Sequence, residues 1–509
     1  MRFYRSKMML PPENLKLKPP DSHQAERIRR TLESAGYTES RVLQLLKISE
    51  WRGARERLSA LPLYLERTRA SDSLNTLVRL FLLRQTVTLD SARRAVSPME
   101  IEDWAEVGLV HLKGDEVAAS VELSLYDGLM VAADWSERAE PDQVMNVAAS
   151  SRALAEMTIR RTVARTLDLG TGCGVQALLA ARHSEEVCGV DSNPRAIRFA
   201  EFNARLNGVS NITWRAGNLF EPIDGETFDL IVCNPPFVVA PVADYLHTST
   251  SLPHDEFCRN LVRAAPKFLS EGGYCQLLCN WCQMEGEDWR ARLATWFEGS
   301  GCDAWAMHAH TEEASLYAFN RIGERVQDKA LAARKFNEWV NYYRRERIEA
   351  IGFGLLTMRR RDGRENWFRC DSLPEVRGAC GEEIARGFAV RDFLEATRDD
   401  EQLLSARLRR SDKIEWQQRL TLSTEGWSIK ESRLSLAEGL SYVAQADEDV
   451  IEFLSQCDGR FELRDYLREL SAVKRQAIEN LAADFLRVVR RLIELGFLSP
   501  ADTTSMTKR

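Results

Sequence analysis

The chain has 509 residues, a formal net charge of −7 at pH 7, and 44% hydrophobic and 28% charged residues. This composition is typical of a soluble globular protein of about three domains, and the acidic balance excludes binding of nucleic acid through a global basic field. No apolar run approaches membrane-spanning length, and the odd count of 11 cysteines fits a reducing compartment better than a disulfide framework. We therefore expect a cytoplasmic protein without membrane partners.

Residues 1–144 predict a mainly helical N-terminal domain. Lys113-Gly114-Asp115 predicts a hairpin between residues 109–112 and 117–123. Helices followed by a small hairpin resemble a winged helix, which binds nucleic acid in some proteins and docks partners or substrates in others. Because the expected helices carry no dense Lys/Arg face, docking is favoured. The helices are expected at 22–35, 40–48, 74–83, 89–96 and 98–107.

The stretch 166–237 carries the chemical motifs, and it begins as a strand, a glycine turn and a helix. The turn reads Asp168-Leu169-Gly170-Thr171-Gly172-Cys173-Gly174. A nicotinamide-binding fingerprint would need its third glycine at position 175, which is Val. The Gly-x-Gly-x-Gly spacing instead lets the backbone approach a ligand closely without building a pyrophosphate turn.

A second apolar run, Val187–Val190, ends on Asp191, whose carboxylate suits the two hydroxyls of a ribose. A glycine loop and a ribose-binding acid are what a nucleoside without phosphates needs, and S-adenosylmethionine is the common ligand of that kind. Alternating strands and helices predict a parallel sheet that binds ligands at the carboxyl ends of its strands. Strands are expected at 166–169, 187–190, 212–216, 228–233, 275–279, 303–310 and 348–358.

These motifs, ending in Asn234-Pro235-Pro236-Phe237, resemble the class I S-adenosylmethionine-dependent methyltransferases of the (Asp/Asn)-Pro-Pro-(Tyr/Phe) branch. The whole chain looks like glutamine-N5 and small-domain N-methyltransferases. The resemblance covers about residues 145–362. It implies an α/β fold with a seven-stranded Rossmann-like methyltransferase core between mainly helical, winged-helix-like domains at 1–144 and 363–509.

The resemblance also implies a role for each motif residue, with S-adenosyl-L-methionine as cofactor and S-adenosyl-L-homocysteine as its product. Many relatives have Asp where this chain has Asn218, although an amide can still bond the adenine edge. The methionine part would be held by Asp168, Gly170, Thr171, Gly172, Cys173 and Gly174, the ribose by Asp191, and the adenine by Asn218 and Leu219. Asn234, Pro235, Pro236 and Phe237 would face the methyl acceptor, with Asn234 also bordering the cofactor.

The chemistry of the Asn-Pro-Pro-Phe motif can be argued without the family. An amide or ring-bound amino nitrogen is a poor nucleophile because its lone pair is delocalised. If the Asn234 side-chain carbonyl and the Pro235 backbone carbonyl both accept from that NH2 group, the lone pair turns out of plane toward the methyl group. Prolines fix the backbone without competing donors, and Phe237 offers a flat face for a planar acceptor. A structural turn is the alternative interpretation of this motif.

Residues 238–253 predict a loop over the acceptor pocket that could determine specificity. His247 and His254 invite a catalytic role, but no metal partners lie nearby in the sequence, and ordinary surface histidines are favoured. No metal site is expected.

Cys275, Cys279 and Cys282 have the Cys-x3-Cys-x2-Cys spacing of an iron–sulfur site. Their apolar run follows Gly272-Gly273, where the fifth strand of the fold belongs. Buried thiols of a strand are therefore favoured over a cluster.

Seven arginines form two basic clusters that could grip phosphates or an acidic protein surface. The alternative is a solvated strand end and turn. Residues 363–509 carry no chemical motif and predict an accessory α-rich domain, in which Ser471–Leu495 is expected as one amphipathic helix ended by Gly496. The arginines are Arg344, Arg345, Arg347, Arg359, Arg360, Arg361 and Arg364.

Three functions remain open for this sequence. The first is S-adenosylmethionine-dependent methylation of a macromolecule, most of all a protein glutamine side chain at N5. The second is methylation of an exocyclic base amine, adenine N6 or guanine N2, in RNA or DNA. The acidic balance favours protein, whereas Phe rather than Tyr at position 237 favours RNA-directed relatives. The third is a non-catalytic cofactor-binding scaffold, against which the intact Asn234 motif argues. The sequence does not fix the oligomeric state.

Overall fold

The computed structural model describes residues 17–51, 54–136, 140–241, 252–323, 326, 328–424 and 426–501. The chain forms two compact units. The first, here the core unit, comprises the residues up to Ala155 together with Thr162–Ser372. The second, here the C-terminal unit, comprises Glu156–Arg161 together with the residues from Leu373 on. No described helix has both the length and the apolar character needed to cross a membrane.

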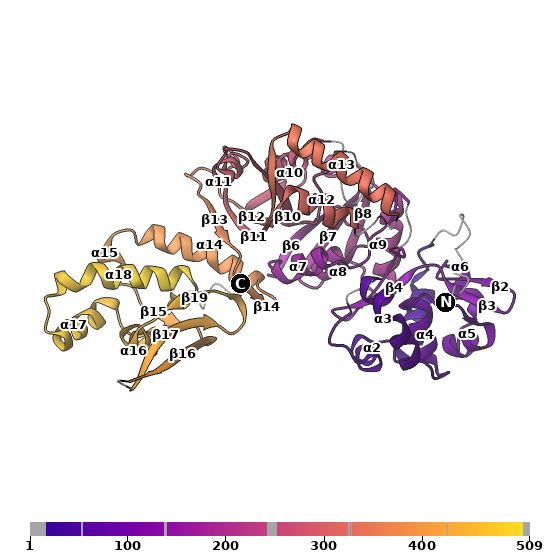
Figure 1. Cartoon of the computed structure of the whole chain (residues 1–509), viewed down its shortest axis with the longest axis horizontal. Coiled ribbons are helices and arrows are strands. Elements are labelled where there is room, and N and C mark those ends of the chain that lie inside the picture. Colours follow the sequence, from indigo (N-terminus) through magenta and orange to yellow (C-terminus); the bar gives the residue numbers. More distant parts are fainter. Residues whose placement is uncertain are drawn as a thin grey trace. The chain divides into compact units, whose positions relative to one another are not determined.

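Helices dominate the N-terminal part of the core unit (Figure 1). The predicted hairpin is confirmed, because β2 pairs antiparallel with β3, and β1 adds a third strand. The order α4, β1, α5, α6, β2, β3 is that of a winged helix. Helix α3 was not predicted, since Pro62 lies within it. The bounds are α1 Ser22–Ser34, α2 Glu39–Leu46, α3 Ala54–Arg67, α4 Ser73–Phe81, β1 Val87–Thr88, α5 Leu89–Val96, α6 Ile101–Glu106, β2 Val110–Lys113 and β3 Glu116–Ala119.

The centre of the core unit is an eight-stranded sheet with the order β13-β11-β12-β10-β9-β6-β7-β8. Strands β10, β9, β6, β7 and β8 run parallel, while β12 is antiparallel to both β10 and β11. All seven predicted strands are present, and β13 is an unpredicted eighth strand at the edge. The bounds are β6 Val163–Leu169, β7 Ser184–Asp191, β8 Ile212–Ala216, β9 Phe228–Cys233, β10 Leu269–Met284, β11 Cys302–Glu313, β12 Ile348–Arg360 and β13 Phe368–Ser372.

Helices and short 3-10 turns connect these strands and bury their apolar side chains. Leu178 and Leu179 of α8 and Phe199 and Phe202 of α9 join the hydrophobic core of the N-terminal helices. A second core joins α10 and α11 to side chains from six strands of the sheet. The bounds are α7 Ala149–Met157, α8 Val175–Ala180, α9 Pro194–Leu206, η1 Glu221–Ile223, α10 Glu256–Ala264, η2 Ala265–Phe268 and α11 Trp289–Ala294.

A second hairpin, β4 (Glu122–Tyr126) with β5 (Leu129–Ala133), ties the N-terminal elements to the sheet region. The side chains of Asn203 and Asn207 in α9 form hydrogen bonds with the backbone of β5, as the backbone of a neighbouring strand would. The Asn203 side chain accepts from the Ala132 N–H at 2.8 Å and donates to the Ala132 carbonyl at 2.9 Å. Asn207 does the same for Met130, at 3.0 and 2.8 Å. These side chains thus satisfy backbone groups of β5.

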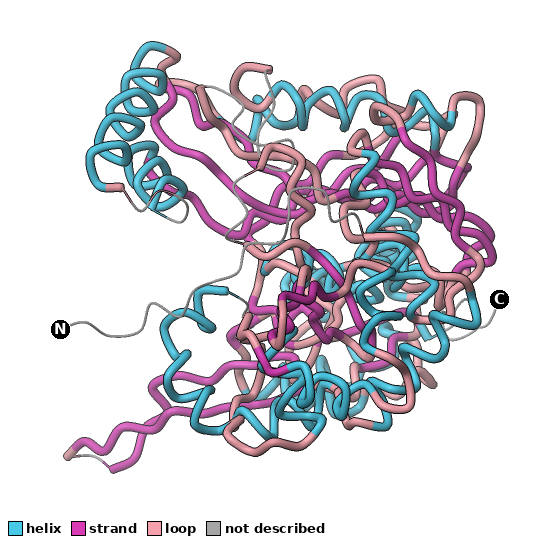
Figure 2. Tube along the Cα trace, turned by 90° about the vertical axis from the view of Figure 1, so that its right-hand side faces the viewer, coloured by secondary structure: helices cyan, strands magenta, loops and turns pink. Residues whose placement is uncertain are grey.

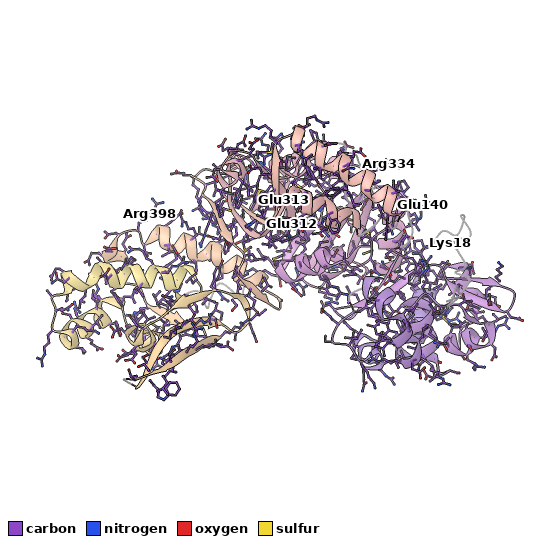
Figure 3. The ribbon with its side chains drawn as sticks, in the orientation of Figure 1. Lys18, Glu140, Glu312, Glu313, Arg334 and Arg398 are labelled. Carbon is purple, nitrogen blue, oxygen red and sulfur yellow. The ribbon has the colours of Figure 1, made fainter. Side chains whose placement is uncertain are left out.

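Helices α12 (Ala314–Gly323) and α13 (Lys329–Arg345) are inserted between β11 and β12. Their aromatic side chains, including Tyr317 and Tyr343, form a core with Val239, just beyond the Asn-Pro-Pro-Phe motif. At the start of α12, Glu313 accepts from the Leu316 N–H at 3.0 Å, beside Glu312 at the end of β11 (Figure 3). The insertion therefore packs at the carboxyl end of the parallel strands.

The C-terminal unit contains helices α14–α18 and, in addition, strands that were not predicted. Its core gathers α14–α18 around the base of the β16–β17 hairpin, which extends away from the helices of this unit (Figures 1 and 2). The bounds are β14 Glu375–Arg377, α14 Gly381–Ala396, α15 Asp400–Leu404, β15 Leu408–Arg410, β16 Ile414–Ser423, β17 Gly426–Leu436, β18 Gly439–Ser441, β19 Val443–Gln445, α16 Glu448–Gln456, α17 Leu463–Lys474, α18 Ile478–Glu494 and β20 Leu498–Pro500.

The single helix expected over Ser471–Leu495 is wrong. Arg475 adopts a left-handed conformation with φ of 54°, so α17 ends there and α18 begins three residues later. The Ser471 hydroxyl donates to the Gln476 carbonyl at 2.6 Å and closes the turn. No Gly or Pro occurs at this break, so the sequence contained no signal for it.

Candidate functional site

The predicted motifs leave the sheet at its carboxyl edge in register with one another. Leu169, the last residue of β6, pairs with both Val190 of β7 and Cys233 of β9. Gly170, Asp191 and Asn234 each follow one of these three residues, so all three lie at the carboxyl ends of neighbouring strands. The sheet therefore places the glycine loop between the acidic residue and the Asn-Pro-Pro-Phe motif.

The three glycines of the loop have positive φ angles of 75°, 56° and 84° at positions 170, 172 and 174. A Cβ added at Gly170 or Gly172 would meet no described protein atom within 4 Å. At Gly174 it would lie 3.0 Å from Ala200 Cβ and 3.3 Å from the Trp214 ring. The first two glycines thus border open space that a ligand can approach, while Gly174 lets the loop pack on α9.

Asp168 is buried at the end of β6, 2% exposed, and fixes the loop from inside. Its Oδ2 accepts from the Thr171 hydroxyl at 2.6 Å and from the Ala177 N–H at 2.9 Å. Burial raises the pKa of the Asp168 carboxyl to about 7, although these two hydrogen bonds oppose the shift. A cation bound nearby would favour the ionised form.

Asp191 ends β7 and accepts two backbone hydrogen bonds. Its Oδ2 accepts from the Gly172 N–H at 2.9 Å and its Oδ1 from the Asn193 N–H at 2.8 Å. Burial raises the pKa of its carboxyl, and both hydrogen bonds counteract that rise. Each carboxylate oxygen keeps a further lone pair that can accept from a ribose hydroxyl.

The remaining residues predicted to bind the cofactor differ in where their side chains lie. The Thr171 side chain turns inward to Asp168, and Cys173 is buried, which raises the pKa of its thiol to about 12. The Gly217 N–H donates to the Asp191 carbonyl at 3.0 Å, which brings the next two residues beside Asp191. Of these, Asn218 is exposed and donates to Glu221 at 3.1 Å, and Leu219 has φ of 48°.

The motif predicted to face the methyl acceptor follows β9 directly. Asn234 is half-buried, and its Nδ2 lies 3.2 Å from the hydroxyls of both Ser150 and Ser151. Pro235 is buried and Pro236 half-buried. Phe237 packs against Phe353 of β12 at a ring-centroid distance of 5.5 Å. The motif therefore combines an amide, a rigid backbone and an aromatic face.

Sequence reasoning missed the two serines, which lie more than 80 residues before Asn234. It also missed Gln176, whose Nε2 donates to the Ser151 carbonyl at 2.7 Å. Ser150 and Ser151 lie in the first turn of α7, and the structure brings them to the Asn234 amide. Two adjacent serines at a helix start were the only sequence signal, and such pairs are common.

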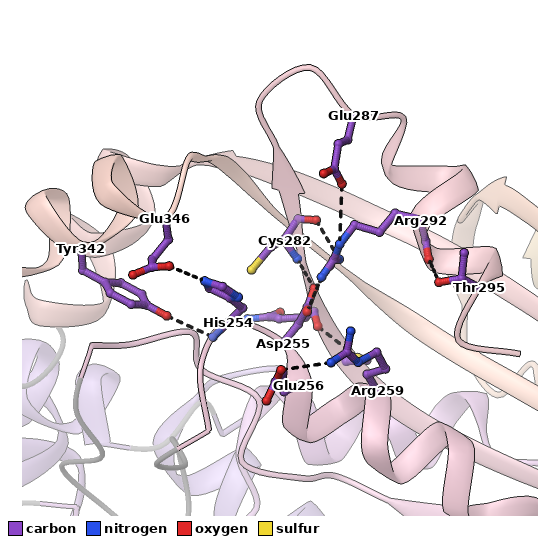
Figure 4. A network of polar contacts seen from close by, with 12 residues as sticks. His254, Asp255, Glu256, Arg259, Cys282, Glu287, Arg292, Thr295, Tyr342 and Glu346 are labelled. Atoms are coloured by element: carbon purple, nitrogen blue, oxygen red, sulfur yellow. Dashed lines mark hydrogen bonds and ion pairs between the residues drawn. The ribbon is translucent and has the colours of Figure 1, made fainter.

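His254 belongs to a polar network around the start of α10 (Figure 4). Its Nε2 lies 3.1 Å from Glu346, and its backbone N–H donates to the Tyr342 hydroxyl at 3.0 Å. The buried Asp255 beside it holds Arg292 and the Cys282 N–H, at 2.6 and 2.7 Å. His254 therefore has a structural partner set, whereas His247 lies outside the described residues.

The cysteines of β10 confirm the predicted strand. Cys275 and Cys279 lie in one hydrophobic core and Cys282 lies in another, as strand alternation requires. Burial raises the pKa of all three thiols. Within the described ranges, no group of three His, Cys, Asp or Glu side chains is suited to hold a metal ion.

Comparison with known families identifies the segment that carries this site. Residues 145–287 match the family model described as a methyltransferase small domain. This segment is therefore similar to methyltransferase small domains, and its mainly parallel sheet agrees with the predicted α/β core. Residues 34–120 and 385–500 each match a model described as a domain of unknown function.

Three curated relatives are similar over this region. The release factor glutamine methyltransferase of Geobacter sulfurreducens is 35% identical over 138 residues, which is 24% of this chain and 48% of that protein. The ribosomal protein uL3 glutamine methyltransferase of Bordetella pertussis is 35% identical over 22% and 42% of the two chains. The ribosomal RNA small subunit methyltransferase C of Alcanivorax borkumensis is 33% identical over 23% and 32%. The chain thus spans half or less of each relative's length.

Proposed function

We propose that this chain is an S-adenosylmethionine-dependent N-methyltransferase that acts on a planar amide nitrogen, most of all the side chain of a protein glutamine. The observation that carries the proposal is the register of the carboxyl edge. Since Leu169 pairs with Val190 and Cys233, the glycine loop, Asp191 and Asn234 converge from three adjacent strands. Catalysis by this site would rest mainly on positioning.

The residues present fit the cofactor of the domain. The open space at Gly170 and Gly172 can receive the methionine part, and Asp191 can accept from the ribose hydroxyls. When bound, the cofactor supplies a methyl group on a sulfonium. The full proposed set is Asp168, Gly170, Thr171, Gly172, Cys173, Gly174, Asp191, Asn218, Leu219 and Asn234, and Asp168 with Cys173 would act through the loop backbone they hold.

Asn234, Pro235, Pro236 and Phe237 would activate the acceptor. The Asn234 Oδ1 and the Pro235 carbonyl would accept from the acceptor NH2, so that its lone pair leaves conjugation. Phe237 and Phe353 would stack on the planar group. The proton can leave after transfer, so the site needs no strong base.

Charge favours a protein acceptor over nucleic acid. The third helix of the winged-helix-like part is α6, which carries Glu102, Asp103 and Glu106 and no Lys or Arg. A recognition helix lies close to the phosphates of DNA, which would repel these carboxylates. Arg359 and Arg364, two arginines of the second predicted basic cluster, donate to the buried Asp303. Their charge therefore balances a carboxylate of the protein itself. Two of the similar relatives are named as glutamine methyltransferases.

The second candidate is an exocyclic base amine in RNA or DNA, which has the same planar NH2 geometry. Phe237 and the similarity to a ribosomal RNA methyltransferase favour it. A base within a duplex would have to be flipped out to reach Asn234. A non-catalytic scaffold would need neither the Asn234 amide nor the aromatic pair beside it.

Label transfer separates these functions. The full-length chain is incubated with methyl-tritiated S-adenosylmethionine and a cell lysate, and the product is treated with protease or nuclease. We expect protease alone to release the label. Loss of label to RNase or DNase would support the base amine, and no label in any fraction would support the scaffold. Asn234→Ala should reduce transfer about 10²-fold or more and leave the affinity for S-adenosylhomocysteine within about threefold.

A further inference from the structure

Two serines hold the nitrogen end of the Asn234 side chain. The hydroxyls of Ser150 and Ser151, in the first turn of α7, each lie 3.2 Å from Nδ2. An amide nitrogen carries two N–H groups, and each hydroxyl can accept one of them. With Nδ2 engaged in this way, Oδ1 is turned away from the serines.

The orientation of this amide matters for the proposed reaction. Oδ1 is the only atom of this side-chain amide that accepts hydrogen bonds. The NH2 group of the molecule to be methylated can therefore donate only to Oδ1. An amide rotated by 180° would present N–H to N–H and would repel the acceptor. Two hydroxyls that accept from both N–H groups would therefore stabilise the rotamer in which Oδ1 faces the NH2 group to be methylated.

The serines are themselves tied to the cofactor loop. Gln176 follows Gly174 by two residues in α8 and is 6% exposed. Its Nε2 donates to the Ser151 carbonyl at 2.7 Å. A continuous chain of contacts thus runs from the glycine loop through Gln176 and Ser151 to Asn234.

We propose that Ser150 and Ser151 are positioning residues that set the rotamer of the Asn234 amide, and that Gln176 couples this rotamer to the glycine loop. The inference rests on the proposed function for its kinetic consequence. The geometry itself can be tested without any acceptor, so the two claims can fail separately.

The kinetic test compares the Ser150→Ala/Ser151→Ala change in two backgrounds, with label transfer from tritiated S-adenosylmethionine to lysate protein as the readout. With Asn234 present, kcat should fall about 10- to 100-fold, because a misplaced group loses its alignment. The Kd for S-adenosylhomocysteine should change less than about twofold. In the Asn234→Asp background the same double substitution should lower kcat less than about threefold. Both oxygens of a carboxylate accept hydrogen bonds, so its rotation by 180° does not change what it offers.

Matched variants separate positioning from structural damage. Ser151→Thr keeps the hydroxyl and should retain at least about half of the activity. Ser210→Ala removes an exposed serine between α9 and β8, at the other end of the sheet, and should have no effect. An equal loss in the Asn234 and Asn234→Asp backgrounds, or no loss in either, would overturn the inference. If Asn234→Asp transfers no label, the Ser151→Thr comparison and the spectroscopic test below decide.

The second test follows the amide directly by NMR on the full chain with ¹⁵N in the asparagine side chains. The Asn234 NH2 signals are assigned by their loss in Asn234→Asp. In Ser150→Ala/Ser151→Ala these signals should shift and exchange with solvent at least about tenfold faster, while Gln176→Ala should shift them less. Unchanged signals would contradict the positioning role even if transfer occurs. Shifted signals without any transfer would uphold it and reject the proposed function.

Discussion

At the scale of single residues, the glycines of the loop differ in what surrounds them. Gly172 borders open space, whereas Gly174 lies against Ala200 and Trp214. Both have φ values that cost an L-residue about 1–2 kcal/mol. Only Gly174 would add a steric conflict with the protein itself, so the two positions separate ligand binding from folding.

The Gly172→Ala and Gly174→Ala variants should therefore behave differently. Gly172→Ala should lower the free energy of unfolding by about 1–2 kcal/mol and weaken S-adenosylhomocysteine binding at least tenfold, because its methyl group enters the ligand's space. Gly174→Ala should lower the free energy of unfolding by about 2–5 kcal/mol, as strain and overpacking add. Urea denaturation and calorimetry measure the two effects. Wild-type affinity in Gly172→Ala would contradict the assignment of the loop.

Asp168 should make the ligand-free protein pH-sensitive. The pKa of its carboxyl rises from 3.8 to about 7 on folding. A raised acid pKa means that the stabilisation is fully present below about pH 4 and is lost as pH rises through about 7. The free energy of unfolding should fall across that window by up to a few kcal/mol, and Asp168→Asn should remove this component. Parallel pH profiles for the wild type and Asp168→Asn would refute the burial argument.

At the scale of elements, the α9 asparagines link the N-terminal hairpin to the cofactor loop. Asn203 is fully buried and serves three backbone groups, the N–H and C=O of Ala132 and the Cys173 carbonyl at 2.8 Å. No apolar residue can replace these hydrogen bonds, and water has little access. The glycine loop is thereby held by an element outside the motif.

Asn203→Ala should lower the free energy of unfolding by about 2–4 kcal/mol, because buried backbone groups lose their partners. The exposed Asn480→Ala in α18 is the control and should stay within about 0.5 kcal/mol. Chemical denaturation measures both variants. An Asn203→Ala protein as stable as the wild type would show that β5 finds other partners.

The predictable elements were those in which local signals agree. The run from Thr166 through Gly174 combined apolar spacing with glycines, and the strand and loop followed from it. Arg475 breaks a helix without Gly or Pro, and β13 is added at an edge by pairing with β11, so neither had a local signal. Ser150 joins Asn234 only through the tertiary fold. Long-range contacts of this kind were outside the reach of the sequence.

At the scale of the whole molecule, the cofactor site and the winged-helix-like part share one compact unit, and the C-terminal residues form another. A ligand stabilises only the unit that binds it, by RT ln(1 + [L]/Kd). We expect calorimetry of the full chain to resolve two transitions, of which S-adenosylhomocysteine raises one. At 100 times Kd the shift corresponds to about 2.7 kcal/mol. A single transition that S-adenosylhomocysteine raises as a whole would mean that the two units unfold together.

The central claim is that Asn234 directs a methyl group to an amide nitrogen of a protein. The most direct measurement is strong acid hydrolysis of the tritium-labelled, protease-sensitive product of the full chain. An N-methyl amide breaks down in acid to the free acid and methylammonium. Once the hydrolysate is made alkaline, the label should distil as methylamine, and this volatile label should be absent when Asn234→Ala replaces the wild type. Label that stays on a non-volatile amino acid or on a base would contradict the account.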